Sequence, residues 1–429
     1  MTRPAAPLVI LCAVGSSGDV HPFVGLGREL VARGCRVTLL AAGYFRRLVE
    51  RAGLRFVDPL PDLDFATAIA DPVIWDRYRG TKVILEKMGR PLLEGLHATL
   101  VGLDEPGRTL VVASSLAFGA RVAAETHAIP LVSVHLSPAL FRSVYDSPRL
   151  PAGWTHVGPR WWRRLQWAGI DRFLADPAIA PWLDPFRARH GLAPVRGILR
   201  DWWHSPTCVL GMFPEWFAPP QPDWPPQARL VGFPLYSEEG VSAPERATAA
   251  WIESGPPPIV FTPGSANVFG HAFFAAAVEA CGILGRRGLL LSRFPEQVPA
   301  ALPDHVRHVD FVPFRWLLPR AAALVHHGGI GSASQALAAG IPQVIMPLGF
   351  DQFDNLARVE RLGVGTGLVP RRFRGPALAA RLGNLLGDSA VAAACAALAA
   401  KIAAEDGIGR AADEVCRLLP HTTIVARPH

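Results

Sequence analysis

The chain has 429 residues, well beyond the roughly 250–300 at which a single hydrophobic core stops growing, so we expect two domains. Half of the residues are hydrophobic, which is ample for packed cores, and the net charge of +7 is spread along the chain rather than gathered in blocks. This charge favours an acidic ligand or a membrane surface and argues against a nucleic-acid-binding arm. The six cysteines show no CxxC or CxxH spacing, so neither a disulfide framework nor a zinc site is indicated.

The first residues, MTRPAAPLVILCAVGSSG, have the order of a secretory signal, with an arginine before a short apolar run. The apolar core, residues 8–14, is at the short limit, and the residues after it are typical of the turn that follows a first β-strand. No uninterrupted apolar stretch approaches the ~18 to 20 residues that cross a bilayer. We therefore expect a cytoplasmic protein with reduced cysteines. The sequence leaves open a peripheral association with the cytoplasmic membrane.

Residues 7–41 predict a buried strand, a turn of glycine and serine, an amphipathic helix and a second strand. The same order recurs over residues 257–292, PPIVFTPGSANVFGHAFFAAAVEACGILGRRGLLLS. Two such openings, about 250 residues apart, predict an α/β protein with two doubly wound, Rossmann-like domains that face each other across a cleft.

Proline is dense between the two halves, in FPEWFAPPQPDWPPQARLVGFP, so no helix or long strand is expected there. We interpret this stretch as the interdomain connector. The tail that follows the second domain could fold back across the first. The predicted boundaries are 1–215 for the first domain, 216–235 for the connector, 236–408 for the second domain and 409–429 for the tail.

Ten of the twelve tryptophans lie between Trp75 and Trp224, with a local cluster in RWWRRLQW, residues 160–167. Alternating arginine and aromatic residues suit an interface with one wet and one apolar side, although ordinary helix packing with exposed arginines would give the same pattern. With apolar runs such as TKVILEKMGRPLLEGL, the cluster favours a first domain that meets a hydrophobic molecule.

The stretch HHGGIGSASQALAAG follows a predicted strand and opens a helix. Gly328 and Gly329 let the backbone approach a ligand, and the unpaired N–H groups of the helix start can hold a diphosphate. Ser332 and His327 can each donate a hydrogen bond to a phosphate oxygen. A metal bound by His326 and His327 is not expected, because adjacent residues of a strand point to opposite faces.

The next strand ends at LGFDQFDN, so Asp351 and Gln352 emerge at the same carboxyl edge as the histidine loop. A carboxylate beside an amide offers hydrogen-bond acceptors and donors that match sugar hydroxyls. A phosphate site and a hydroxyl-binding pair at one edge predict a nucleotide-sugar ligand.

The segment HHGGIGSASQALAAGIPQVIMPLGFDQFDNLARVERLGVG resembles the donor-binding signature of family 1 glycosyltransferases, which are inverting enzymes of the GT-B fold. The segment GSSGDVHPFVGLGREL is similar to the acceptor-side motif of the same superfamily. Over essentially the whole length, in DWWHSP, FPEWFAPPQPDWP and VGFPL among others, the sequence most resembles the B-type rhamnosyltransferases of rhamnolipid biosynthesis.

This resemblance implies the phosphate contacts of a donor site. It assigns His327 to the α-phosphate, and Ser332 with the Gly331 amide to the other phosphate. Ser265, in FTPGSAN, would approach the diphosphate from the facing loop. Ser332 stands where relatives more often have threonine, and serine keeps the hydroxyl group.

The resemblance also implies the sugar and nucleoside contacts. Asp351 and Gln352 would bind the sugar, and the segment 311–319, which begins with Phe311 and Val312, would form the wall for the base. Gln335 stands where many relatives have a glutamate that accepts hydrogen bonds from both ribose hydroxyls. Because a glutamine accepts through one oxygen only, a deoxyribose, and hence a dTDP-sugar, becomes the favoured donor.

The family supplies its catalytic base from the first loop of the first domain, where GSSGDVHPF places Asp19, with His21 two residues on. We expect Asp19 to be the base, with His21 as the alternative, although Asp19 could also serve only to cap the helix. The start of the α-helix at Ser332 can stabilise the leaving group, so no metal or other cofactor is expected. A DxD triplet at Asp62–Asp64 resembles a metal-binding motif of another glycosyltransferase fold, but its loop is in the wrong domain.

The resemblance implies transfer of L-rhamnose from dTDP-L-rhamnose to the hydroxyl of a 3-(3-hydroxyalkanoyloxy)alkanoate lipid, giving a mono-rhamnolipid. Residues expected at the acceptor are Ser17, Gly18, Trp75 and His135, although the sequence favours a buried, satisfied histidine at His135 over one that lines the pocket. The main alternative is a UDP-glucose-dependent enzyme acting on a sterol, a polyketide or another hydrophobic acceptor. A nucleotide-sugar epimerase and an inactive binding subunit are the alternatives from other classes.

Overall fold

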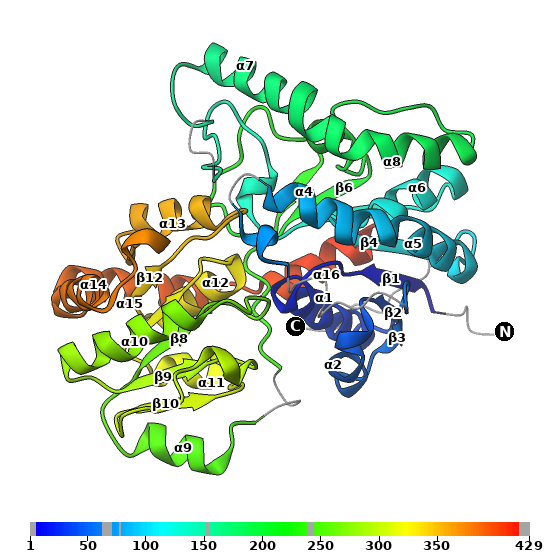
Figure 1. Ribbon diagram of the computed structural model, residues 1–429. Coiled ribbons are helices and arrows are strands. Elements are labelled where there is room, and N and C mark those ends of the chain that lie inside the picture. The colour runs from blue at the N-terminus through cyan, green and yellow to red at the C-terminus, as the bar shows by residue number, and fades with distance from the viewer. Residues whose placement is uncertain (1–5, 62–70, 77–78, 152–154, 239–242, 420–429) are drawn as a thin grey trace.

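The computed structural model describes the chain except for residues 1–5, 62–70, 77–78, 152–154, 239–242 and 420–429. Two parallel sheets form two Rossmann-like domains of the GT-B fold (Figure 1). The first sheet has the order β3-β2-β1-β4-β5-β6-β7. Its strands are β1 (Leu8–Cys12), β2 (Arg36–Leu40), β3 (Arg55–Val57), β4 (Thr109–Ser114), β5 (Leu131–His135), β6 (Cys208–Gly211) and β7 (Ala228–Leu230).

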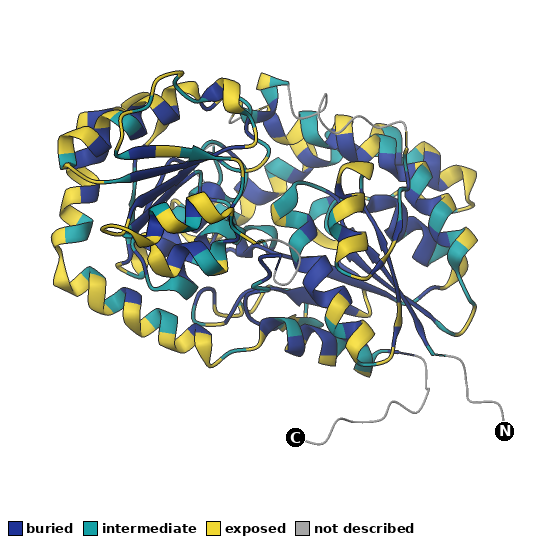
Figure 2. Ribbon diagram, turned by 90° about the horizontal axis from the view of Figure 1, so that it is seen from below, coloured by how far each residue is buried: buried dark blue, intermediate teal, exposed yellow. Residues whose placement is uncertain are grey.

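The second sheet has the order β10-β9-β8-β11-β12-β13. Its strands are β8 (Ile259–Thr262), β9 (Gly288–Leu291), β10 (Val306–Val309), β11 (Ala323–His326), β12 (Gln343–Ile345) and β13 (Gly365–Gly367). Because all neighbours within each sheet are parallel, the loops after the strand ends gather at one edge of each sheet. The central strands of both sheets are buried, whereas the edge strands β3, β7, β10 and β13 are partly exposed (Figure 2).

Helices cover both faces of each sheet, which is why the central strands, such as LVILC of β1, are hydrophobic without alternation. The helices of the first half are α1 (Ser17–Ala32), α2 (Arg46–Arg51), α4 (Gly80–Ile84), α5 (Arg90–Leu103), α6 (Phe118–His127), α7 (Arg160–Ile170) and α8 (Asp176–Arg189). Those of the second half are α9 (Arg246–Glu253), α10 (His271–Leu284), α11 (Phe314–Leu317), α12 (Ile330–Ala339), α13 (Gln352–Arg361), α14 (Gly375–Gly387), α15 (Ser389–Ala403) and α16 (Gly407–Arg417).

The chain between the domains differs from a free connector over residues 216–235. The three residues of β7 pair with β6 and extend the first sheet, because a strand this short fits between Pro226 and Pro234. The connector is therefore shorter than its composition predicts, and the chain leaves the first sheet only after Leu230.

The last described helix, α16, returns to the first domain and packs against α1. Its buried residues Ala411, Ala412 and Val415 belong to the same hydrophobic core as Phe23 and Val24 of α1. The chain thus crosses between the domains twice. The two crossings touch, since a Cβ on Gly232 would lie 3.3 Å from the Cα of Gly407, and a Cβ on Gly407 would collide with the Phe233 carbonyl oxygen.

A buried arginine joins the domains on the side of α13. Arg358 is 3% exposed and donates to Asp354 in its own helix at 2.7 Å and to the Phe217 carbonyl of the first half at 3.1 Å. It also lies 3.3 Å from Asp146, and the Arg149 amide donates to Asp354 at 3.0 Å. Residues 146–149 are thereby fixed against the second domain.

No single helix in the described part of the chain is both long and apolar enough to cross a bilayer. The pair made of α14 and residues 389–417, bent by 72° at its break, meets that test only when its two parts are joined.

Candidate active site

The carboxylate of Asp19 lies at the amino end of α1, where the turn after β1 leaves the first sheet. It accepts hydrogen bonds from the amide of Ser16 at 2.7 Å and from its hydroxyl at 3.1 Å, both through Oδ2. Gly15 makes room for this arrangement, because its φ of +138° suits glycine and a Cβ there would collide with the carboxyl group. Asp19 therefore does contribute to the helix start, through one of its two oxygens.

The environment of Asp19 favours a proton acceptor. Burial raises the pKa of Asp19 to about 6, the hydrogen bonds from Ser16 lower it, and the negative charge of Asp351 raises it. A carboxylate with a pKa near neutrality can take up a proton under physiological conditions more readily than an ordinary aspartate.

His21 is held by the segment that leaves the first domain after β7, residues 231–238, which we call the crossing chain. Its Nε2 lies 3.2 Å from Oε1 of Glu238, and its ring meets the edge of Tyr236 with the centroids 5.9 Å apart. Glu238 is 7% exposed and has a φ of +54°, so the crossing chain is fixed in an unusual conformation at this point. Because Nε2 is engaged by Glu238, only Nδ1 of His21 could take up a proton, and the choice of Asp19 over His21 as the base stays a prediction.

The amino end of α12 meets the amino end of α1. The Cα of Gly18 lies 3.9 Å from the position that a Cβ would take on Gly331. Each helix start carries unpaired N–H groups and a partial positive charge, so an anion between them would be bound from both domains. Ser332, in the first turn of α12, is only half-buried and can present its hydroxyl to the same place.

His327 lies beside this helix start. Its ring packs so closely on Gly264 and Gly329 that a Cβ on either residue would stand 2.6–3.0 Å from ring nitrogens. Among the described residues its buried Nδ1 has no hydrogen-bond partner, and burial lowers its pKa to about 4. A neutral imidazole with an unsatisfied nitrogen matches the role of phosphate ligand. Ser265 is exposed next to Gly264 in the chain, and its contact with the diphosphate stays a prediction.

The neighbouring His326 has a structural role. It is fully buried, its Nε2 lies 3.0 Å from Oε1 of Gln343, and its Nδ1 accepts from the Gly328 amide at 3.1 Å. Burial lowers the pKa of His326 to about 3. The imidazole therefore fixes the glycine turn that leads into α12, and Gln343 is a supporting residue that the sequence pattern did not reveal.

Asp351 is oriented by Asn355, one turn further along α13. The Asn355 amide donates to Oδ2 of Asp351 at 2.8 Å and to the Gly328 carbonyl at 2.9 Å, while the Ser137 hydroxyl donates to the Asn355 oxygen at 3.3 Å. Burial raises the pKa of Asp351. Asn355 thus links the loop that carries Asp351, the glycine turn and the first domain. Its spacing of four residues from Asp351 was the available sequence signal.

Gln352 stabilises the loop that carries Asp351, residues 348–351, which we call the aspartate loop. Its side-chain oxygen accepts from the amides of Leu348 at 2.7 Å and Gly349 at 3.0 Å, and the residue is 3% exposed. The oxygen is therefore used by the protein backbone in this structure, and a contact of Gln352 with the sugar stays a prediction.

The segment expected to form the base wall lies at the junction of the domains. The Phe311 ring lies 5.2 Å from the guanidinium carbon of Arg293, which also donates to the Tyr44 hydroxyl of the first domain at 2.9 Å. Val312 is 2% exposed and packs in the core of the second domain, so it can offer a ligand its backbone only. Arg293 had no distinguishing sequence signal.

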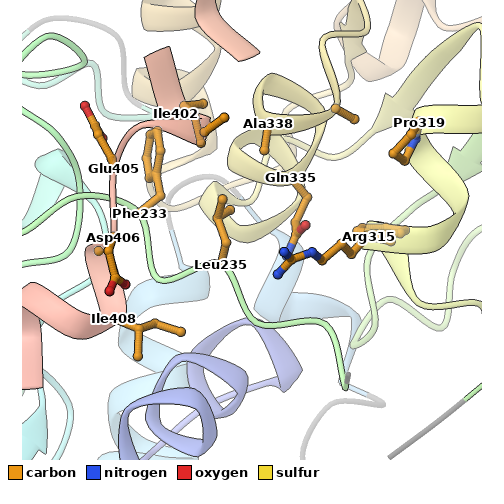
Figure 3. Close-up of a pocket in the computed structure, with 14 residues that line it drawn as sticks. Phe233, Leu235, Arg315, Pro319, Gln335, Ala338, Ile402, Glu405, Asp406 and Ile408 are labelled. Atoms are coloured by element: carbon orange, nitrogen blue, oxygen red, sulfur yellow. The ribbon is translucent and has the colours of Figure 1, made fainter. Parts of the chain in front are cut away.

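Gln335 borders a cavity of about 490 Å³ between α11, α12, the crossing chain and the start of α16. Gln335 and Arg315 are directed toward each other inside it (Figure 3). The Gln335 amide donates to the Tyr236 carbonyl at 3.4 Å, so the side chain is oriented by the crossing chain. The cavity therefore adjoins the position expected for the ribose.

The residues expected at the acceptor are not all brought together. Ser17 and Gly18 lie at the start of α1 beside Asp19. Trp75, in a short helical turn (Pro72–Trp75), meets Phe350 of the aspartate loop with ring centroids 6.1 Å apart, and its buried indole nitrogen has no partner among the described residues. Trp75 thus faces the second domain at the rim of the site.

His135 is instead fully buried at the end of β5. Its Nε2 lies 2.9 Å from Nδ1 of His204, and its ring packs against Phe141 and Trp203. Burial lowers the pKa of His135. We therefore correct the expectation that His135 lines an open acceptor pocket, since aromatic packing encloses it.

Within the described residues, no group of three or more histidine, cysteine or acidic side chains could hold a metal ion. The triplet Asp62–Asp64 lies outside the described residues. The six cysteines are free.

Two Rossmann-like domains whose helix starts meet, with a buried imidazole beside one start and the Asp19 carboxylate at the other, form the architecture of the GT-B class of glycosyltransferases. The model of the glycosyltransferase family 28 N-terminal domain matches residues 9–146. The model of the erythromycin biosynthesis protein CIII-like C-terminal domain matches residues 292–417.

The chain is 31% identical over 420 residues to O-mycaminosyltylonolide 6-deoxyallosyltransferase of Streptomyces fradiae, in an alignment that covers 94% of this chain and 95% of that protein. It therefore belongs to the same family of GT-B glycosyltransferases and is an enzyme of that kind.

Solved structures support the fold. The glycosyltransferase of kitacinnamycin superposes with a TM-score of 0.73 at 24% identity, over 97% of this chain and all of that one. The spinosyn rhamnosyltransferase SpnG, complexed with thymidine diphosphate, superposes with a TM-score of 0.67 at 19% identity, over 96% of this chain and 100% of that one.

Proposed function

We propose that the protein transfers L-rhamnose from dTDP-L-rhamnose, with inversion, to the hydroxyl of a 3-(3-hydroxyalkanoyloxy)alkanoate, giving a mono-rhamnolipid. The observation that carries the proposed chemistry is the meeting of the two helix starts, with Asp19 on one and His327 beside the other. The dTDP donor is supported by Gln335, because a glutamine can accept hydrogen bonds through one oxygen only and the residue borders the cavity beside α12.

In the proposed reaction Asp19 takes the proton of the acceptor hydroxyl while that oxygen attacks the anomeric carbon from the face opposite the diphosphate. The bond between the sugar and the diphosphate breaks as the new glycosidic bond forms. The amides at the start of α12, the Ser332 hydroxyl and His327 stabilise the charge that develops on the leaving diphosphate. We propose that this proceeds without a metal ion.

A polyketide acceptor is the second candidate. It is favoured by the relative from Streptomyces fradiae, whose name describes transfer of a 6-deoxyallosyl group to O-mycaminosyltylonolide. A UDP-glucose-dependent enzyme would use the same chemistry. It is disfavoured by Gln335, because many relatives have at this position a glutamate that accepts hydrogen bonds from both ribose hydroxyls. Membership of the family argues against an epimerase. We propose a cytoplasmic location, supported by the six free cysteines.

The test is a transfer assay read by mass spectrometry. Purified protein is incubated with dTDP-L-rhamnose or UDP-glucose, each with a hydroxyalkanoyloxyalkanoate or a macrolide aglycone. We expect a product only from dTDP-L-rhamnose with the lipid, and NMR should show an anomeric configuration opposite to that of the donor. If UDP-glucose but not dTDP-L-rhamnose gives product, the donor assignment is wrong. If the macrolide aglycone but not the lipid is glycosylated, the acceptor assignment is wrong.

A further inference from the structure

Exposed apolar side chains concentrate on one segment of the first domain. Of the twelve large hydrophobic side chains that are exposed among the described residues, six lie between residues 157 and 174. We call them the α7 surface: Val157, Trp161, Trp162, Leu165, Phe173 and Leu174, with exposed fractions from 45% to 72%. Single exposed apolar residues are ordinary, whereas a concentration of them marks an interaction site.

The α7 surface belongs to a helix whose inner face is already packed. The helix α7 continues through a π-helical turn (Asp171–Ala175) into α8 and lies at the outer edge of the first domain (Figure 1). On its inner side Trp167 is buried under the guanidinium of Arg142, and its indole nitrogen donates to Ser147 at 3.4 Å. The protein core therefore does not need the outward residues, which remain in water.

The charge around these residues is positive. Arg160, Arg164 and Arg172 are exposed between the apolar side chains. The one acidic residue from 157 to 174 is Asp171, which is buried and paired with Arg142. The surface thus combines tryptophan and arginine without an exposed carboxylate over residues 157–174, which is the composition of helices that lie in the headgroup region of anionic membranes.

We propose that the α7 surface docks this enzyme on a bilayer that contains anionic lipid, with the tryptophans and leucines in the interfacial region and the arginines on the headgroup phosphates. Trp161 and Leu165 are four residues apart and share one helix face, so both can enter the same leaflet. The aromatic residues supply the apolar area, and each arginine adds electrostatic attraction that depends on salt.

The α7 surface is linked structurally to the candidate active site. Arg163 of α7 donates to the carbonyls of Val144 and Tyr145, and the same loop is fixed to α13 through Asp146. The α7 surface is therefore joined by one short loop to the helix that begins after Asp351. Docking would hold the rim of the active site close to the leaflet, although the binding itself does not depend on which acceptor is used.

The experiment is co-sedimentation of the full chain with vesicles of phosphatidylcholine alone and with vesicles of equal parts phosphatidylcholine and phosphatidylglycerol, each at low and high salt. We expect binding to the anionic vesicles, weaker binding at high salt, and little binding to the neutral ones. The variant Arg164→Glu/Arg172→Glu should lower the partition coefficient at least about twentyfold, since one basic residue accounts for about fivefold. Trp161→Ser/Leu165→Ser should lower it at least about tenfold.

Matched controls come from the second domain. Ile283→Ser removes an apolar residue that is 55% exposed, and Arg371→Glu reverses an exposed arginine, so both should bind like the wild type. Melting temperatures and transfer to a water-soluble acceptor should be unchanged in all variants, which shows that they are folded. Equal binding to neutral and anionic vesicles, or full binding by both α7 variants, would overturn the proposal. The proposal would also be overturned if the wild-type protein does not bind vesicles but forms a dimer that the α7 variants abolish.

Discussion

Gly18 and Gly331 come so close that a Cβ on Gly331 would lie 3.9 Å from the Cα of Gly18, which joins the starts of α1 and α12 across the domain junction. Two helix starts that face each other concentrate unpaired N–H groups and partial positive charge in one place. A Cβ at either position would make only ordinary van der Waals contacts, so the close approach rests on the backbone of the two helix starts.

Asp19→Asn and Asp19→Ala should each lower kcat by about 10²-fold or more, because neither side chain can accept the hydroxyl proton. Donor affinity, measured by calorimetry with dTDP, should stay within a few-fold of the wild type. His21→Ala should lower kcat less than about tenfold, since Asp19 and not His21 takes the proton in the proposed reaction. The reverse ranking of the Asp19 and His21 variants would make His21 the base.

The pH profile of kcat/KM should show an acid limb near pH 6. The carboxylate must be ionised to accept a proton, and because burial raises the pKa of Asp19 to about 6, activity falls as pH drops through that value rather than near pH 4. The residual activity of Asp19→Asn should lack this limb. A wild-type limb near pH 4 would show that Asp19 is solvated in the working enzyme.

The adjacent histidines should separate binding from stability. His327→Ala should weaken dTDP binding about tenfold to a hundredfold with little change in melting temperature, because it removes a hydrogen bond to a charged group. His326→Ala should lower the free energy of unfolding by about 1–3 kcal/mol, because it leaves the Gly328 amide and the Gln343 oxygen unpaired inside the protein. Calorimetry and thermal melting on both variants check this, and equal effects of the two would contradict it.

Gln335→Glu should move the preference from dTDP-sugars toward UDP-sugars by about tenfold in the ratio of kcat/KM values, since a carboxylate can accept from two ribose hydroxyls. The same change removes the amide that donates to Tyr236, so the rate with either donor should also fall. Gln335→Ala is the control, which should slow both reactions without favouring UDP. An unchanged ratio in the glutamate variant would place Gln335 away from the ribose.

Arg358→Met should lower the free energy of unfolding by about 3–5 kcal/mol, because it leaves the buried Asp354 without its charged partner. Arg361 offers a matched control, since it lies 3.6 Å from Asp146 but is 57% exposed in its side chain. Arg361→Met should cost less than about 1 kcal/mol. Denaturant unfolding measures both, and similar losses would mean that the buried cluster does not hold the domains together.

The periodic parts of the sequence predicted the fold, and the features that they could not predict are contacts between distant segments. A hydrophobic run, a glycine turn and an amphipathic helix are local, so the two Rossmann-like openings and the place of His327 before α12 followed directly. The strand β7 did not follow, because a three-residue strand between prolines has no periodicity and depends on the exposed edge of β6.

Within the site, residue type predicted chemistry better than it predicted partners. The sequence predicted the same role, sugar binding, for Asp351 and Gln352. In the structure Asn355 orients Asp351, whereas the side-chain oxygen of Gln352 accepts hydrogen bonds from backbone amides of its own loop. Glu238 and Asn355 were missed because their roles arise only when the domains meet, at His21 and Ser137 respectively. A single sequence carries no record of such pairs.

The contact between Gly232 and Gly407 determines how the enzyme can open. Both covalent links between the halves pass through one spot, so we expect the halves to swing about that pivot when the enzyme opens. Turnover should therefore depend on the stiffness of this pivot, although neither glycine is one of the residues proposed to act on the reacting atoms.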